Sequence, residues 1–125
     1  MEIRSYRDLK VWQKSMRIAQ EIYSVTAQFP QEELYGLSGQ MRRAAISVPS
    51  NIAEGHARDS SREYLRYISI TFGSVAELET QITLAAYCGY ITEESEGALL
   101  NKLHEIGIML RSLQSAMKVK IDADS

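Results

Sequence analysis

The stretch ALLNKLHEIGIMLRSLQSAM, residues 98–117, places large apolar side chains at spacings that alternate between four and three residues. Side chains at these spacings lie along one side of an α-helix. The alternation is typical of a helix that packs lengthwise against other helices. The apolar positions are Leu99, Leu103, Ile106, Leu110, Leu113 and Met117. We therefore expect this segment to line the core of a helical bundle.

Toward the N-terminus, the same periodicity predicts three more helices with short links between them. Short links place consecutive helices antiparallel to one another. The sequence therefore predicts an all-α fold, an antiparallel up-down-up-down four-helix bundle that forms one domain over residues 1–125. The expected helices cover about residues 6–28, 33–55, 60–88 and 92–118.

Local signals mark the helix ends and one irregularity. Ser60 and Glu63 have the spacing of a capping box at the start of the third helix. Gly55 and Gly89 are suited to end the second and third helices. Pro49 lies inside the second helix, where it removes a backbone hydrogen bond, so we expect one continuous helix that is kinked at this residue.

The composition excludes several classes of protein. Hydrophobic residues make up 45% and charged residues 24% of the 125 residues, the usual balance of a globular domain. The one cysteine, Cys88, excludes an intrachain disulfide, and its apolar neighbours predict a buried thiol. The most apolar stretch, residues 82–91, has about half the length that a membrane span needs, and the N-terminus has no secretory signal. We expect a cytoplasmic protein that does not contact a membrane.

The sequence lacks the motifs of common catalytic and cofactor sites. It has no phosphate-binding glycine loop, no metal-binding His or Cys spacing, and no nucleophile elbow. His56 and His104 lie on different elements and are expected at the surface. We expect no catalytic residue, no cofactor and no metal, and therefore no enzymatic activity. A weaker alternative is an enzyme whose site lies at a subunit boundary.

Glu79 is a charged residue on the apolar face of the third helix. A buried carboxylate needs a partner, and antiparallel pairing brings the second helix close to it. We expect a structural ion pair between Arg42 and Glu79, with Arg43 as a substitute for Arg42. The functional alternative is a carboxylate that transfers protons or binds a metal.

The positive charge is uneven along the chain. Residues 1–66 carry ten Lys or Arg against eight Asp or Glu, and residues 67–125 carry four against eight, for a net charge of −2. Arg58, Arg62 and Arg66 recur every four residues and form what we call the basic edge. Arginines of this kind bind phosphates, so the basic edge is a candidate RNA or DNA contact. The alternative is a solvated face, because Asp59 and Glu63 interleave with the arginines.

The first helix has two apolar stripes on nearly opposite sides. One contains Leu9, Trp12, Met16, Ala19 and Tyr23, and the other contains Val11, Ile18, Ile22 and Val25. One stripe is enough for a bundle core, and we assign the first stripe to it. The second stripe would then be exposed, which is typical of an interface between protein chains. We therefore expect a homo-oligomer whose interface is formed by Val11, Ile18, Ile22 and Val25; the reverse assignment is the alternative.

Three segments resemble one known family. They are DLKVWQKS (8–15), LYGLSGQMRRAAISVPSNIAEG (34–55) and SREYLRYISITFGSVAELETQ (61–81). They resemble the four-helix-bundle proteins encoded in intervening sequences of bacterial 23S ribosomal RNA. That family in turn is similar to the accessory variability determinant proteins of diversity-generating retroelements, which bind nucleic acid and a reverse transcriptase. The matching positions are read as structural: Trp12, Arg42, Arg43, Pro49, Asn51, Glu54, Gly55 and Glu79.

The resemblance implies a homopentamer without known enzymatic activity, and it supplies no catalytic residues. Together with the residue analysis, it favours a non-enzymatic, homo-oligomeric scaffold or accessory protein whose partner is a further copy of itself. The alternative function is an RNA- or DNA-binding accessory protein that uses the basic edge.

Overall fold

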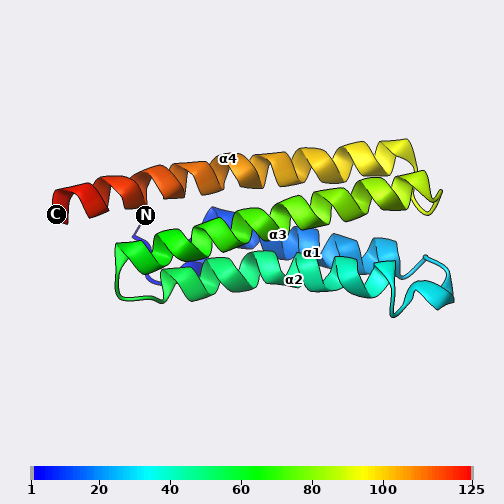
Figure 1. The fold of residues 1–125 in the computed structure, drawn as a ribbon, viewed down its shortest axis with the longest axis horizontal. Coiled ribbons are helices and arrows are strands. Elements are labelled where there is room, and N and C mark those ends of the chain that lie inside the picture. The colour runs from blue at the N-terminus through cyan, green and yellow to red at the C-terminus, as the bar shows by residue number, and fades with distance from the viewer. Residues whose placement is uncertain (1, 125) are drawn as a thin grey trace.

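The computed structural model describes residues 2–124, and within them all regular structure is helical. Four α-helices run antiparallel in sequence order, as Figure 1 shows, so the predicted all-α, four-helix architecture is confirmed. The helices are α1 (Lys10–Thr26), α2 (Leu37–His56), α3 (Ser61–Tyr87) and α4 (Glu93–Asp124), with two 3₁₀ helices, η1 (Tyr6–Asp8) and η2 (Gln31–Glu33).

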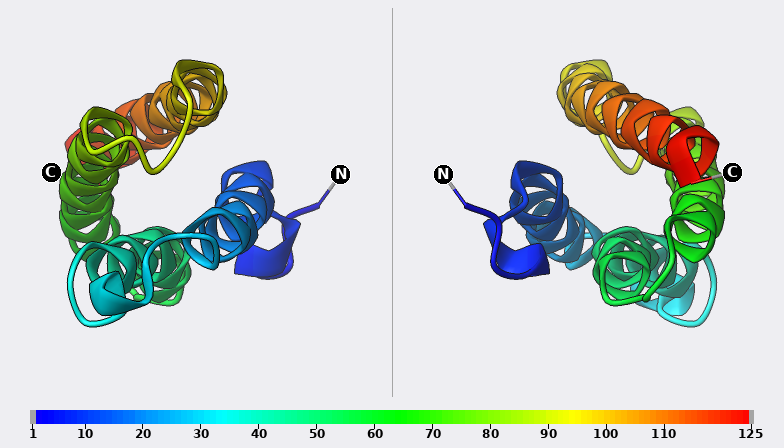
Figure 2. Two further views of the ribbon diagram at one scale, coloured as in Figure 1. Left: turned by 90° about the vertical axis from the view of Figure 1, so that its right-hand side faces the viewer. Right: turned by 90° about the vertical axis from the view of Figure 1, so that its left-hand side faces the viewer.

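Each helix packs against its neighbour in sequence, and the end-on views in Figure 2 show the four helices around an arc. The pair α2–α3 has the most extensive contact, and α1 meets α4 only weakly where the arc closes. The α1–α2 pair and the α3–α4 pair therefore form opposite sides of the molecule.

The core lies along the inner side of this arc and receives side chains from every helix. The largest fully buried apolar side chains are Ile22, Met41, Leu78, Ile82, Leu103, Ile106 and Leu110. The apolar row predicted for the last helix is confirmed, since Leu99 and Met117 are also buried and Leu113 packs against the core. This helix continues to Asp124, further than the predicted end near residue 118.

The end of α3 has the geometry that its glycine predicts. Gly89 adopts a left-handed φ of 77°, which glycine reaches without steric cost. The N–H of Tyr90 then donates to the carbonyl of Ala85 at 2.9 Å, and the N–H of Gly89 donates to that of Ala86 at 3.0 Å. These two bonds form a Schellman motif, which satisfies carbonyls left free at the helix end.

The start of α3 is capped on one side. The Ser60 hydroxyl accepts a hydrogen bond from the Glu63 N–H at 3.1 Å, as predicted. The second predicted bond, in which the Glu63 carboxylate accepts from the Ser60 N–H, is not formed within residues 2–124; that carboxylate pairs with Arg66 at 3.8 Å. The sequence analysis missed the complete capping box at η1, where Ser5 and Asp8 satisfy each other's backbone.

Gly55 does not end α2, contrary to the sequence prediction. The helix runs through it to His56, and Gly55 is buried against α3. A Cβ atom at this position would lie 2.7 Å from the Cβ of Tyr67, a separation that real side chains do not tolerate. Glycine is therefore required here because α2 and α3 approach closely. The helix α2 is continuous through Pro49, as expected; the kink stays a prediction.

A carboxylate joins the two loops at one end of the bundle. Glu33 accepts a hydrogen bond from the Leu37 N–H at 3.2 Å through Oε1, and from the Tyr90 hydroxyl at 2.8 Å through Oε2. The hydrogen bond from the Tyr90 hydroxyl to Glu33, together with desolvation and the negative charge of Glu33, raises the pKa of Tyr90 above its ordinary value of 10.0. Glu33 thereby ties the start of α2 to the α3–α4 turn.

Within residues 2–124, no helix combines the length and the apolar character that a membrane span requires.

We predict that Gly55→Ala lowers the free energy of unfolding by about 1–3 kcal/mol, because the added methyl group forces α2 away from Tyr67. The matched control is Gly73→Ala, since a Cβ at the exposed Gly73 of α3 meets nothing within 4 Å. That control should raise stability by about 0.5–1 kcal/mol. Urea unfolding followed by circular dichroism measures both, and equal effects of the two substitutions would contradict the close approach.

We predict that Tyr90→Phe destabilises the protein at pH 7 and that this difference shrinks in alkaline solution. The pKa of Tyr90 is raised in the folded state, so its contribution is complete below the unfolded value of about 10 and is lost as pH rises through the folded value. Urea unfolding of wild type and variant between pH 7 and pH 11 tests this. A difference that stays constant, or grows, over that range would show that the Tyr90–Glu33 bond does not stabilise the fold.

Candidate interaction surfaces

The structure places the second stripe of the first helix in the core and divides the first stripe. Of the first stripe, Ala19 is buried and Leu9 and Trp12 pack against the core, as predicted. Val11, Ile18 and Ile22 are buried in the core, and Val25 packs against it. The predicted interface of Val11, Ile18, Ile22 and Val25 is therefore wrong as an exposed surface. On the opposite stripe, which was assigned to the core, Met16 and Tyr23 are each 45% exposed.

Two small polar side chains lie on the buried face of α1. Ser15 and Thr26 lie between the stripes, and both are buried. Their hydroxyls donate to the carbonyls of Val11 and Ile22, one helical turn back, at 2.6 Å each. Because their polar groups are satisfied within the helix, these residues can enter the core. The buried face is thus centred on the hydroxyls rather than on the aromatic residues.

The exposed stripe of α1 forms one wall of a groove, and α2 forms the other. This α1–α2 groove has a volume of about 760 Å³. Ile46 is 46% exposed in it, so three large apolar side chains of the groove are close to half exposed. Its main apolar lining consists of Tyr6, Trp12, Met16, Tyr23, Ile46 and Pro49. Contiguous exposed apolar surface of this kind is typical of interaction sites.

Arginines surround the α1–α2 groove. Arg7 lies 5.4 Å from the ring centroids of both Tyr6 and Trp12, which contact each other edge to face. Arg17 lies between this groove and the α1–α4 cleft and lines both, and it makes no hydrogen bond or ion pair with any residue that the structure describes. Among its described lining residues there is no carboxylate. The groove is therefore apolar with a positive border.

The predicted Arg42–Glu79 ion pair is wrong. Arg42 instead donates through Nε to the Thr26 hydroxyl at 2.8 Å and lies 5.0 Å from the centroid of the Tyr23 ring. The substitute, Arg43, is exposed. Arg42 is thus drawn to the α1 side of α2, away from α3. Glu79 is half-buried and has no hydrogen-bond or ion-pair partner within residues 2–124.

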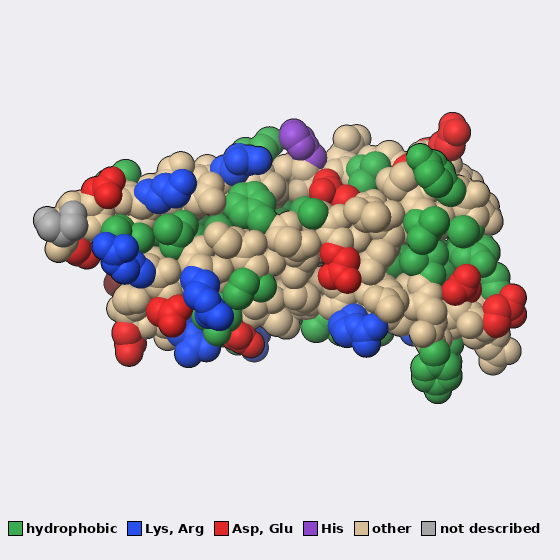
Figure 3. Space-filling view, viewed as in Figure 1, with side chains coloured by type: hydrophobic (Ala, Val, Ile, Leu, Met, Phe, Trp, Pro, Cys, Tyr) green, Lys and Arg blue, Asp and Glu red, His purple; other side chains and the backbone are tan. Residues whose placement is uncertain are grey.

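Glu79 belongs to a second apolar surface, which we call the α3–α4 patch. It lines a hollow of about 580 Å³ with Thr80, Thr83, Leu84, Tyr87 and Leu100. Leu84 is 47% and Tyr87 83% exposed. Figure 3 shows hydrophobic side chains gathered where α3 ends and α4 begins. The sequence from residue 67 to residue 101 contains no Lys or Arg, so the patch carries a carboxylate without a neighbouring cation on its own segment.

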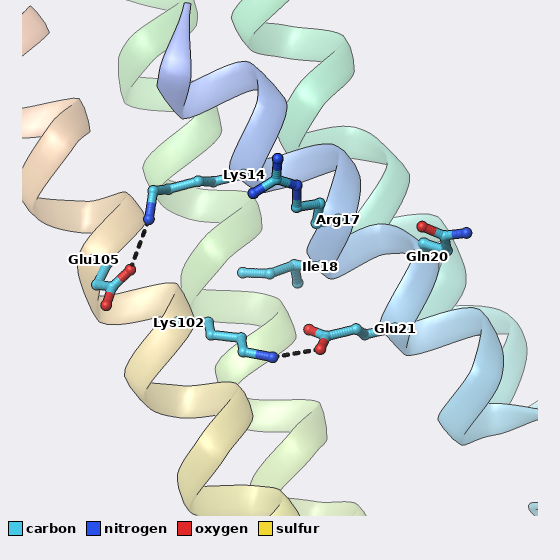
Figure 4. Close-up of a pocket in the computed structure, with 7 residues that line it drawn as sticks. All are labelled: Lys14, Arg17, Ile18, Gln20, Glu21, Lys102 and Glu105. Atoms are coloured by element: carbon cyan, nitrogen blue, oxygen red, sulfur yellow. Dashed lines mark hydrogen bonds and ion pairs between the residues drawn. The ribbon is translucent and has the colours of Figure 1, made fainter.

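The seam between α1 and α4 contains a cleft of about 500 Å³ bridged by two ion pairs (Figure 4). Lys14 pairs with Glu105 at 3.1 Å, and Lys102 pairs with Glu21. Ile18 lies between the pairs. The four charged side chains are 39–58% exposed, so each pair contributes little to stability.

The basic edge is exposed, and the structure places two of its three arginines on one ring. Arg58 donates to the Tyr67 hydroxyl at 2.6 Å and lies 4.9 Å from its ring centroid. Arg66 lies 5.5 Å from the same centroid. Arg62 does not join this cluster. The sequence analysis missed Tyr67, although its place one residue after Arg66 was a usable signal.

The remaining candidate side chains are dispersed. The Cys88 thiol is exposed, so the prediction that it is buried is wrong; it follows the last turn of α3, where the helix has already left the core. His104 is exposed, and His56 packs edge to face on Tyr64 with ring centroids 5.8 Å apart. Burial raises the pKa of the Tyr64 phenol. Nowhere in residues 2–124 do three or more potential metal ligands gather.

The sequence profile of the 23S rRNA-intervening sequence proteins matches residues 7–112. The chain belongs to this family. A crystal structure of a protein of unknown function from the S23 ribosomal protein family of Bacteroides thetaiotaomicron is also similar, with a TM-score of 0.78 and 25% sequence identity. The similarity covers 84% of this chain and 95% of that one. No curated protein matches the chain.

The surfaces described above lie almost entirely within the part of this 23S rRNA-intervening sequence protein that the family match covers. The family match begins within η1 and ends within α4, so it includes the α1 and α2 sides of the α1–α2 groove, the whole α3–α4 patch and the basic edge.

Proposed function

We propose that this 23S rRNA-intervening sequence protein is a non-enzymatic, homo-oligomeric scaffold or accessory protein. The observation that carries the proposal is the α1–α2 groove. Met16 and Tyr23 on α1 and Ile46 on α2 form an apolar surface in this groove that the chain's own core does not cover. Burying such a surface against another chain removes apolar area from water and favours association.

Three further parts belong to the proposal. The assembly is a pentamer, which is what the family resemblance implies. The protein acts in the cytoplasm, where its single exposed thiol, Cys88, stays reduced. It works by presenting repeated surfaces rather than by catalysis.

We predict that the wild type has a mass well above the 14.1 kDa of one chain when it is measured by light scattering. Met16→Glu with Ile46→Glu should lower that mass while the helical circular dichroism is kept, because both side chains are exposed in the groove. Ile108→Glu is the matched control, since Ile108 is 55% exposed on α4 and should leave the mass unchanged.

Substitution of the buried stripe gives the contrasting result. Ile18→Glu with Ile22→Glu should abolish the helical signal, because both residues lie in the core. A wild type that runs as a monomer at all concentrations would refute the homo-oligomer proposal.

A second candidate function is binding of single-stranded RNA or DNA at the basic edge, and the Tyr67 cluster favours it. The cluster places one aromatic side chain next to two phosphate-binding groups, a combination that single-strand-binding proteins use for bases and backbone. The resemblance to retroelement accessory proteins, which is an expectation from the sequence alone, implies the same function. An assembly would multiply this edge, which raises the affinity for a long strand.

We predict that a random single-stranded RNA binds at low salt and that Arg62→Ala with Arg66→Ala weakens this binding. The slope of log affinity against log salt should fall by about 0.7 for each phosphate that the variant no longer neutralises. Arg43→Ala with Lys102→Ala, two exposed cations outside the basic edge, removes the same charge and is the control. Filter binding at several salt concentrations measures both. Equal weakening in the two variants, or no binding by the wild type, would exclude the basic edge.

A further inference from the structure

The two apolar surfaces of the chain carry opposite charge. The α1–α2 groove has aromatic side chains on its α1 side and Arg17 as a free cation. The α3–α4 patch has two exposed apolar side chains, Leu84 and Tyr87, and Glu79 as a free anion. Each surface therefore supplies the charge that the other lacks.

The bundle itself keeps the two surfaces apart. The groove is formed by α1 and α2, and the patch by α3 and α4, which lie on opposite sides of the arc in Figure 2. They cannot meet within one chain. A two-fold dimer through the groove would join two surfaces that each carry Arg17 and no carboxylate among their described lining residues, which like-charge repulsion disfavours. Groove-to-patch contact between copies avoids this repulsion.

We infer that the α1–α2 groove of one copy receives the α3–α4 patch of the next, and that Arg17 of the first copy pairs with Glu79 of the second. This inference rests on the proposed homo-oligomer and adds its partner surface. The contact is heterologous: each copy has one free groove and one free patch, so association continues until a ring closes. Tyr87 and Leu84 enter the apolar groove, and Glu79 gains the cation that its own chain does not provide.

The charge pair is tested by reversal and rescue. Glu79→Arg and Arg17→Glu should each lower the mass measured by light scattering toward 14.1 kDa, because each places like charges in the contact. The double variant with both substitutions should recover the wild-type mass, because every contact again has opposite charges. Glu77→Arg is the matched control. Glu77 is exposed two residues earlier on α3, about 200° around the helix from Glu79, and should leave the mass unchanged.

The heterologous geometry is tested by mixing. A groove variant, Met16→Glu with Ile46→Glu, and a patch variant, Leu84→Glu with Tyr87→Glu, should each be a folded monomer by circular dichroism and light scattering. Each retains the surface that the other lacks. Mixed at equal concentration they should form a species of two chains, about twice 14.1 kDa, and no larger one.

The outcomes separate this inference from the proposed function. A patch variant that keeps the wild-type mass, variants that stay monomeric when mixed, or a double charge variant without rescue would each overturn the groove-to-patch contact. The homo-oligomer itself would stand in those cases, provided that the wild type is larger than one chain. A monomeric wild type would refute both.

Discussion

The close contact between α2 and α3 is the constraint on which the other parts of the structure depend. Gly55 lets the α2 backbone approach Tyr67, and the hydroxyls of Ser47 and Ser74 hydrogen-bond at 2.7 Å further along the same pair. Small residues permit this approach, and the two outer helices then pack one on each flank of the pair. The same contact holds Tyr67 where Arg58 and Arg66 can reach its ring. It thus positions the basic edge and separates the two apolar surfaces.

Periodicity was sufficient to predict the four helices, because each buries a continuous apolar face. The glycine at the end of α3 was equally informative, since its left-handed φ is a local property of the chain. Gly55 was misread because a glycine that ends a helix and a glycine that admits a neighbouring helix look alike in sequence. Only the position of Tyr67, twelve residues later, distinguishes them.

The surfaces were harder to predict than the helices. Two apolar stripes on α1 were both long enough for a core, and the choice depended on Ser15 and Thr26, whose hydroxyls bond within their own helix and so tolerate burial. The Arg42–Glu79 pairing failed for a different reason. A long arginine side chain can turn toward either neighbouring helix, and Thr26 and Tyr23 on α1 offer it a hydroxyl and an aromatic face.

The weakly packed α1–α4 seam has a consequence for folding. The other helix pairs are hairpins whose partners are close in sequence, so their closure costs little chain entropy and proceeds fast. The seam joins Lys14 to Glu105 and Glu21 to Lys102, residues 91 and 81 positions apart, through exposed charges. Closing this contact orders the longest loop, and it gives the smallest stabilisation in return. We therefore expect α1 to dock on α4 last.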